Sequence, residues 1–406
     1  MKKFKQCVSL FLSFALSAVL LTGCGSTSSD KASSDTDNAA VKHEVTDVYN
    51  YVVDAGTITS IDYDFIREMY ANGNDLTGGC SAIAKVTDDG TMLVGRNMDL
   101  YFSNNPAYVV RTAAEGCYET IGVAYSFMAD WPTYEQVLAE GLSEEQYKEL
   151  PFITTDIMNS EGLFVEINMR NAEFWVSGDS KFACSGTNED SDERVYAQCL
   201  GRYIAENCAD VDAAVEYVNG LDIFTGDSKY SWNFCFILAD ASGHYGLLEI
   251  AGNKVAWLDY QPCQTNFYLD EELAVIEEYQ CGLGRYDYLM SRIDAVQSEE
   301  ELYQLMDQVS YFGIYSEDCP YDVYSEFVGT YPWWTNEYMA DEANRDEIES
   351  VLAGFREKVG SYDEQTLRDR GTSWLSVFTT IANCNEKTMN VRFFEDAAKT
   401  LTLTLG

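Results

Sequence analysis

Histidine is almost absent from this chain, which has 2 histidines among its 406 residues. His43 lies in a polar stretch near the N-terminus, and His244 follows Ser242-Gly243 in a predicted hairpin turn. A Ser–His–Asp or Cys–His nucleophile needs a histidine held on a rigid element beside it. The sequence therefore disfavours such a device, and it also disfavours a zinc site built on two histidines.

Positive charge is scarce as well. The chain carries 26 lysines and arginines against 67 aspartates and glutamates, so its formal net charge is -41. A surface of this sign repels nucleic acid and anionic lipid headgroups, and we expect no nucleic-acid partner. It favours solubility outside the cell. The hydrophobic fraction of 46% is ample for a packed core.

Cysteine pairs at metal-binding spacing are missing, although the chain has 12 cysteines. Cys7 lies in the leader, and Cys24 and Cys80 have separate interpretations below. The others are scattered without a CxxC pair, and their odd number excludes complete pairing within one chain. This spacing disfavours zinc and iron–sulfur sites, and we expect no metal or organic cofactor. Most of these cysteines are expected to be buried as small apolar side chains.

The first residues indicate export. A lysine-rich start is followed by the apolar run Val8–Leu21, which is too short for a stable membrane-spanning helix. Residues 1–24 end in Leu21-Thr22-Gly23-Cys24 and resemble a bacterial lipoprotein signal peptide with its lipobox. The resemblance implies cleavage before Cys24, a lipid on its sulfur, and an exported protein held to the lipid bilayer on the extracytoplasmic face of the cell membrane. An ordinary signal peptide is the alternative.

Two segments separate this leader from Cys80. Residues 25–44 are rich in Ser, Thr, Asp and Ala, and they predict a flexible tether. Residues 45–79 are expected to be a more ordered pro-segment. Within it, Ile61, Phe65 and Ile66 recur at helical spacing and predict a short amphipathic helix near 60–71.

From Cys80 to residue 406, predicted strands come first, helices in the middle and strands last. The strands are expected at 81–86, 92–98, 107–113, 120–127, 152–158, 163–169, 233–239, 245–251, 254–259, 373–381, 388–394 and 400–405. The helices are expected at 192–207, 212–218, 285–296, 299–309 and 342–358. This order predicts an α+β protein in which helices cover a mixed sheet system. The acidic stretch 139–150 and the aromatic stretch 311–338 are expected to be insertions beside the core.

Cys80 is the candidate nucleophile. A thiol without a histidine still needs a base, and a free α-amino group, with a pKa of about 7.7–8.0, suits that role. An N-terminal cysteine carries both groups on one residue, provided that the bond Gly79–Cys80 is cut. Arg96 and Asp99 fall on the second strand of the hairpin that Cys80 opens, where they could favour the thiolate and orient the amine. A structural strand cysteine beside a surface ion pair is the alternative.

The motifs around Cys80 resemble a known family. Cys80-Ser81, Asp89-Gly90 and Gly95-Arg96-Asn97-Met98-Asp99 are similar to the opening of the choloylglycine hydrolase family, which includes bile salt hydrolases and penicillin V acylases. Related acyl-CoA:6-aminopenicillanate acyltransferases share the pattern. The similarity continues to about residue 395 through Met158-Asn159-Ser160-Glu161-Gly162-Leu163, Asn168, Thr265-Asn266, Gly284-Arg285-Tyr286 and the closing strand pair 372–378 and 387–393.

The resemblance implies a fold and a set of roles. The fold would be the αββα sandwich of N-terminal-nucleophile hydrolases. Cys80 would be nucleophile and, through its amine, base, with Arg96 and Asp99 holding the two groups. The Asn266 side chain and the Asn168 backbone N–H would form the oxyanion hole, and Arg285 would order the site.

Three departures from the family pattern are visible. Ser81 replaces a commoner threonine, and Leu100 stands where an aromatic residue is frequent. The gap from Gly162 to Asn168 is short, so Asn171 competes for the role given to Asn168. The long segment before Cys80 resembles members of the family that cut themselves.

We therefore expect a hydrolase of linear amide (C–N) bonds that acts on a small molecule through a thioester on Cys80. Cutting at Gly79 would separate the catalytic domain 80–406 from the lipid on Cys24, and we expect the helix near 60–71 to keep the two parts docked. A cysteine dipeptidase of a neighbouring N-terminal-nucleophile family is the alternative enzyme. A lipid-anchored binding or adhesion protein is the alternative of another class. The sequence leaves the amide substrate and the oligomeric state open.

Overall fold

The computed structural model of the protein describes residues 44–45, 52–70, 79–101, 105–125, 131–169, 184–225, 234–274, 282–310, 342–344, 346, 350, 374–393 and 400–405. All of them belong to one compact unit, Ala40–Gly406. The predicted leader with Cys24, the tether up to residue 43, Asn171 and the aromatic stretch 311–338 lie outside these residues. Within the described part of the chain, none of the helices has the length and apolar character needed to cross a membrane.

The larger sheet has nine strands in the order β1-β2-β5-β6-β7-β8-β11-β12-β13. Only β2 and β5 pair in parallel; the other neighbours are antiparallel. The strands are β1 (Glu44–Val45), β2 (Val52–Ile58), β5 (Ala107–Thr112), β6 (Thr120–Tyr125), β7 (Thr154–Asn159), β8 (Phe164–Met169), β11 (Phe234–Ala239), β12 (Tyr245–Ala251) and β13 (Lys254–Asp259).

The second sheet has six strands in the order β14-β3-β4-β15-β16-β17, all antiparallel. These strands are β14 (Cys263–Gln264), β3 (Gly79–Val86), β4 (Met92–Tyr101), β15 (Trp374–Asn383), β16 (Thr388–Phe393) and β17 (Thr400–Thr404). The short parallel pair β9 (Arg194–Tyr196) and β10 (Asp222–Phe224) forms a ribbon of its own. Cys80 therefore lies near the start of β3, one strand from the edge of the six-stranded sheet.

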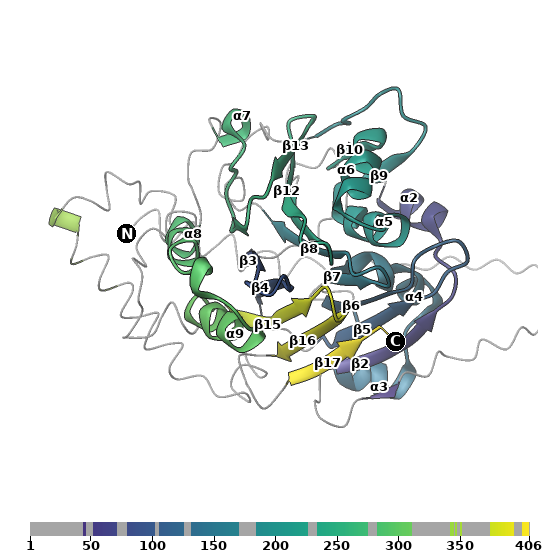
Figure 1. The fold of residues 1–406 in the computed structure, drawn as a ribbon. Helices are drawn as coiled ribbons and strands as arrows, with labels where there is room; N and C mark the ends of the chain where they lie inside the picture. Colours follow the sequence, from purple (N-terminus) through teal and green to yellow (C-terminus); the bar gives the residue numbers. More distant parts are fainter. Residues whose placement is uncertain are drawn as a thin grey trace, which may run out of the picture. The chain divides into compact units, whose positions relative to one another are not determined.

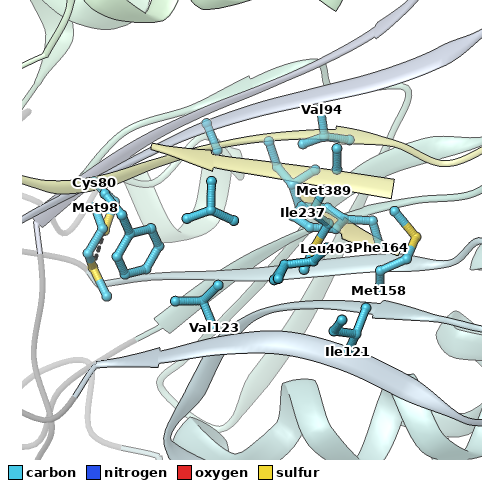
Figure 2. Packing of buried hydrophobic residues seen from close by; sticks show 14 of the residues in the cluster. Cys80, Val94, Met98, Ile121, Val123, Met158, Phe164, Ile237, Met389 and Leu403 are labelled. Carbon is cyan, nitrogen blue, oxygen red and sulfur yellow. Dashed lines mark hydrogen bonds between the residues drawn. The ribbon is translucent and has the colours of Figure 1, made fainter. Parts of the chain in front are cut away.

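The two sheets pack face to face. One buried apolar cluster contains side chains of both sheets, among them Ala82, Val94 and Val391 from the smaller sheet and Val123 and Ile237 from the larger. Figure 2 shows this packing, with Cys80 and Met98 at one end of the cluster. Because successive side chains of a strand point to opposite faces, the alternate residues of each strand face away from this cluster and need a second cover.

Helices supply that cover. The outer face of the larger sheet packs on α5 (Leu200–Asn207) and α6 (Val211–Gly220), and that of the smaller sheet packs on α8 (Leu283–Met290) and α9 (Glu299–Gln308). Figure 1 shows α9 beside β15 and α5 beside β7 and β8. The predicted α+β class and the αββα arrangement are confirmed. The other α-helices of the described residues are α2 (Tyr63–Tyr70), α3 (Tyr134–Glu140), α4 (Glu144–Glu149) and α7 (Glu271–Ala274).

Several predicted boundaries are wrong. The helix expected from residue 192 begins at Leu200, because residues 194–196 form β9 and the next three form a 3-10 turn. The strand expected from residue 152 begins at Thr154, after a 3-10 turn with Pro151 near its start. The helix expected over 285–296 ends at Met290, and a third 3-10 turn follows at Ile293–Ala295. Most of the helix expected over 342–358 lies outside the described residues.

The turn between β7 and β8 fixes the register of two strands that matter below. Asn159 accepts backbone hydrogen bonds from Glu161 and Leu163 with its side-chain oxygen, and its amide donates to the carbonyls of Ala205 and Cys208. Gly162 has φ 89, a left-handed conformation that favours glycine. One asparagine thus closes the hairpin and ties it to α5.

The segment before Cys80 is part of the sheet system. Sequence patterns did not predict β2, yet its Val52 and Val53 are fully buried and the strand pairs with β5. The predicted helix is present as α2, which packs on the larger sheet's helical layer through Ile66. The Tyr63 hydroxyl donates to the buried carboxylate of Glu206 on α5. Residues 52–70 are therefore built into the same core as the strands that follow Cys80.

Candidate active site

The β3–β4 hairpin places a cysteine and an arginine side by side. Cys80 pairs with Met98, and Ala82 pairs with Arg96, so the side chains of Cys80 and Arg96 share the face between the two sheets. Arg96 Nη2 donates to Cys80 Sγ at 3.0 Å and to the carbonyl oxygen of Ile167 at 3.0 Å. Cys80 and Arg96 are 1% and 0% exposed. A buried guanidinium therefore lies directly against the sulfur.

Two carboxylates hold this guanidinium from the opposite sheet. Arg96 Nη1 lies 3.3 Å from Asp156 Oδ1 of β7, and Arg96 Nε lies 3.7 Å from Glu166 Oε2 of β8. All three side chains are fully buried. A buried charge without a partner is costly, so these carboxylates are what permits a cation in the layer between the sheets. Sequence analysis missed both, although acidic residues at inward positions of apolar strands are an anomaly that alternation reveals.

Asp99 lies on the other face of β4, opposite Gly79. Its carboxylate accepts a hydrogen bond from the Ser376 hydroxyl of β15 and lies 3.6 Å from Arg285 Nη1. Asp99 and Arg96 are three residues apart on one strand, so they approach the start of β3 from opposite faces. The structure brings Asp99 to the bond Gly79–Cys80, whereas the sulfur faces Arg96.

Arg285 of α8 contacts Cys80 from the helical side. Arg285 Nη1 donates to the carbonyl oxygen of Cys80 at 2.9 Å and to the Ser81 hydroxyl, and Arg285 Nη2 donates to Asn266 Oδ1 at 2.8 Å. Gly282 precedes this helix with φ 84, and a Cβ there would lie 2.7 Å from Arg285 Nη2. A glycine at this position therefore leaves room for the guanidinium.

Asn266 completes the contacts of the Cys80 backbone. The Cys80 N–H donates to Asn266 Oδ1 at 3.3 Å, and Asn266 Nδ2 donates to the carbonyl of Met169 at 2.6 Å. The edge strand β14 pairs with β3 only at Ile83 and Ala82, so Cys80 lies beyond its end. Side chains of Asn266 and Arg285 take the place of the missing strand partner.

Among the predicted site residues, Asn168 has the least direct link to Cys80. It lies fully buried on β8, paired with Cys235 of β11. With its amide oriented to satisfy both ends, Asn168 donates to Glu166 Oε2 at 3.1 Å and accepts from Gln264 Nε2 at 3.1 Å. Asn168 therefore joins the site through Glu166, and the alternative residue, Asn171, lies outside the described part of the chain.

Burial has the largest effect on the pKa values of Cys80 and Glu166. It raises the pKa of the Cys80 thiol to about 12, against the opposing effect of the Arg96 charge. It also raises the pKa of Glu166 to about 8, again opposed by Arg96 and reinforced by Asp156. In the uncut chain Cys80 is accordingly a thiol, and its nitrogen is a peptide N–H.

His244 belongs to a different part of the molecule. Its Nε2 lies 2.7 Å from Asp259 Oδ1 and its Nδ1 lies 3.2 Å from Asp212 Oδ1. Its ring packs near Trp257 and Tyr260. Throughout the residues that the structure covers, no group of three or more histidine, cysteine or acidic side chains is arranged to hold a metal ion. The chemistry available around Cys80 is that of a thiol, a guanidinium and hydrogen-bond donors.

Comparisons with known proteins find similar solved structures. No protein-family model matches the chain, and no curated protein matches it in sequence. A mutant of the conjugated bile acid hydrolase from Clostridium perfringens is similar in structure, with a TM-score of 0.40, 12% identity, and coverage of 80% of this chain and 92% of that one. A second variant of that enzyme has a TM-score of 0.39, 13% identity and the same coverage, 80% and 92%. Penicillin V acylase from Agrobacterium tumefaciens has a TM-score of 0.36 and 15% identity, over 77% of this chain and 83% of that one.

Proposed function

We propose that this chain is a cysteine amide hydrolase of the N-terminal-nucleophile type, and that Cys80 becomes its nucleophile once the bond to Gly79 is cut. One observation carries the proposal. Each polar atom of Cys80 is held by the side chain of a residue that the sequence motifs single out: the sulfur by Arg96, the nitrogen by Asn266 and the carbonyl oxygen by Arg285. A structural strand cysteine has no need of three such partners.

The first reaction in the proposal is self-cleavage. The Cys80 sulfur attacks the Gly79 carbonyl carbon, the peptide C–N bond breaks, and the nitrogen of Cys80 takes up a proton. Water then hydrolyses the resulting thioester, which releases the carboxylate of Gly79 and restores the thiol. Arg96 favours the thiolate that this step needs, because its charge opposes the effect of burial on the thiol.

The second reaction is acyl transfer from a small amide substrate to water. The thiolate of Cys80 attacks the amide carbonyl, and the amine leaves with a proton from the α-amino group. A thioester remains, and water hydrolyses it with the α-amine as base. Asn266 Nδ2 and the backbone N–H of Asn168 are the proposed oxyanion donors, and such donors typically contribute about 2.7–4 kcal/mol each. Asp99, beside Gly79, orients the new amine.

The position of residues 52–70 supports a two-part mature enzyme. After the cut, β2 and α2 would stay in place, because β2 is a buried strand of the larger sheet and Tyr63 is bonded to Glu206. With a lipid on Cys24, the N-terminal fragment would then hold the catalytic part at the extracytoplasmic face of the membrane. Export and lipidation remain part of this proposal.

The test is intact mass measurement with N-terminal sequencing of the purified protein, wild type beside Cys80→Ala. The proposal expects a wild-type fragment that begins at Cys80 and an uncut Cys80→Ala chain. A fully active protein that is still joined at Gly79 would overturn it. A panel of N-acyl amino acids, conjugated bile salts, penicillin V and dipeptides then identifies the substrate class. Turnover of dipeptides alone would favour the dipeptidase alternative, and an unchanged binding function in Cys80→Ser would favour the adhesion protein.

A further inference from the structure

The guanidinium of Arg96 faces three groups that can carry negative charge. They are the Cys80 sulfur at 3.0 Å, Asp156 Oδ1 at 3.3 Å and Glu166 Oε2 at 3.7 Å. All of them lie in the layer between the sheets, where the exposed fraction of Cys80 is 1% and that of the two acids is 0%. One buried cation cannot stabilise three buried anions at once, so the ionisation of these groups is coupled.

Asp156 is the nearer of the two acids: its Oδ1 lies 3.3 Å from Arg96 Nη1, whereas Glu166 Oε2 lies 3.7 Å from Arg96 Nε. Burial raises the pKa of Asp156 as well, and the Arg96 charge opposes that effect. An aspartic acid ionises more readily than a glutamic acid or a thiol in comparable surroundings. The remaining charge of Arg96 is then shared between Cys80 and Glu166.

The Glu166 carboxyl group can be protonated or ionised, and several hydrogen-bond donors contact it. Gln264 Nε2 donates to its Oε1, and the Asn168 amide, turned to satisfy both ends, donates to its Oε2 at 3.1 Å. The backbone N–H of Ile237 on the neighbouring strand adds a further hydrogen bond. Among the described residues, the charged or titratable groups that face it are Arg96 of β4, Asp156 of β7 and, beyond Arg96, the thiol of Cys80 on β3.

We propose that Glu166 is a positioning residue that controls Cys80 through Arg96. Protonated Glu166 leaves the guanidinium to the sulfur and permits the thiolate; ionised Glu166 draws that charge to itself and disfavours the thiolate. This control deepens the proposed function, because it assigns the pH limit of the same nucleophile. Burial raises the pKa of Glu166 to about 8, so the thiolate is disfavoured as the pH rises through that value.

The experiment measures the ionisation of Cys80 without measuring amide hydrolysis. The full chain is treated with methyl methanethiosulfonate from about pH 6 to about pH 9.5, and the rate of modification at Cys80 is followed by peptide mass. Well below its pKa, a thiol reacts about tenfold faster for each pH unit, in proportion to its thiolate fraction. In the wild type we expect this rise to flatten near pH 8, the value about which Glu166 ionises.

Glu166→Gln keeps the shape of the side chain and removes its charge. We expect the rise to continue past pH 8 in this variant, so that at about pH 9 Cys80 reacts up to about tenfold faster than in the wild type. Any α-amine released by self-cleavage is the same in both proteins, so the difference isolates Glu166. Glu249→Gln is the matched control, because Glu249 is also buried on the larger sheet but accepts hydrogen bonds from the backbone of Leu269 and Asp270.

A second variant provides the test if Glu166→Gln does not fold. Gln264→Met removes a hydrogen bond that favours ionised Glu166, so the flattening should move to higher pH. An unbroken rise in the wild type, or the same break in Glu166→Gln or Gln264→Met, would overturn the inference. A wild type that shows the break but hydrolyses no amide would sink the proposed function and leave the inference standing.

Discussion

Arg285 on α8 donates a hydrogen bond of 2.9 Å to the carbonyl oxygen of Cys80, although the two residues are 205 positions apart in the sequence. The same guanidinium donates to Asn266 Oδ1, which in turn accepts the N–H of Cys80. Arg285 therefore holds both backbone groups of Cys80, one directly and one through Asn266. In the proposed self-cleavage, Arg285 therefore positions the Cys80 backbone for the attack of its sulfur on Gly79.

Removal of this guanidinium should slow self-cleavage. We expect Arg285→Gln to accumulate uncut chain, with the rate of cutting reduced by about tenfold or more, because the attack loses a charge-assisted hydrogen bond of about 1.5–3 kcal/mol that positions the Cys80 backbone in the transition state. The measurement is a time course of intact mass after synthesis. Arg292→Gln is the control, since Arg292 lies just beyond the same helix and stacks on Tyr288 instead. Equal rates in Arg285→Gln and the wild type would show that Arg285 does not act on Cys80.

The N-terminal fragment should stay with the catalytic part after the cut. We expect both fragments of the wild type to elute together in gel filtration, because β2 is buried in the larger sheet. Tyr63→Phe removes the hydroxyl that donates to Glu206 and leaves a buried carboxylate with one fewer donor, which costs about 1–3 kcal/mol. This variant should release the fragment at a lower urea concentration than the wild type.

Asp64→Asn is the matched control for that experiment. Asp64 lies on the same helix with its side chain 89% exposed, its ion pair with Arg67 is solvent-exposed, and exposed pairs contribute about 0–1 kcal/mol. Its release profile should follow the wild type. A wild-type preparation that loses the fragment without denaturant would contradict the docking of residues 52–70.

Sequence patterns predicted the features that depend on residues close together in the chain. The hairpin that carries Cys80 and Arg96 follows from two β-like runs joined by a turn at Asp89-Gly90, and the resemblance to a known family indicated Asn266 and Arg285. Partners across the sheets were not predicted, because a strand sequence shows which residues face inward but not which strand they meet. Asp156 and Glu166 contact Arg96 from the opposite sheet, so the sequence did not predict them.

Strand β2 was not predicted for the same reason. Residues 52–58 pair in parallel with β5, about fifty residues later in the chain, and no hairpin turn joins the two strands. In the pro-segment 45–79 the sequence predicted only the helix near 60–71, because helical periodicity was the stronger local signal. β9 was likewise read as helix, since its parallel partner β10 comes after two helices in the chain.

Stability should depend on pH through Glu166. Its pKa is raised from 4.5 to about 8 on folding, so the folded state keeps a proton that the unfolded state has lost between these values. The stabilisation by this proton is complete below the unfolded pKa and is lost as pH rises through the folded pKa. We expect the melting temperature of the wild type to fall over this window.

Glu166→Gln should flatten that fall, because its side chain does not titrate. Thermal melts at matched ionic strength across the window measure the effect, with Glu249→Gln as the control that should retain the wild-type slope. Parallel curves for the wild type and Glu166→Gln would mean that Glu166 is ionised in the folded protein at neutral pH. The pH limit inferred for Cys80 would then lose its physical basis.

Two glycines have nearly equal φ angles but different surroundings. Alanine substitutions at the two positions therefore separate the cost of a left-handed backbone from the cost of a steric contact. Gly90 and Gly162 have φ of 88 and 89, and both stand in hairpin turns. A Cβ at Gly90 would meet nothing within 4 Å, whereas one at Gly162 would lie 2.5 Å from the carbonyl oxygen of Cys384. Gly90→Ala should cost about 1 kcal/mol from its left-handed backbone alone. Gly162→Ala should cost about 1–3 kcal/mol more, because the carbonyl of a buried residue must move. Urea unfolding of both variants measures the difference, and equal losses would show that the β7–β8 turn does not pack against Cys384.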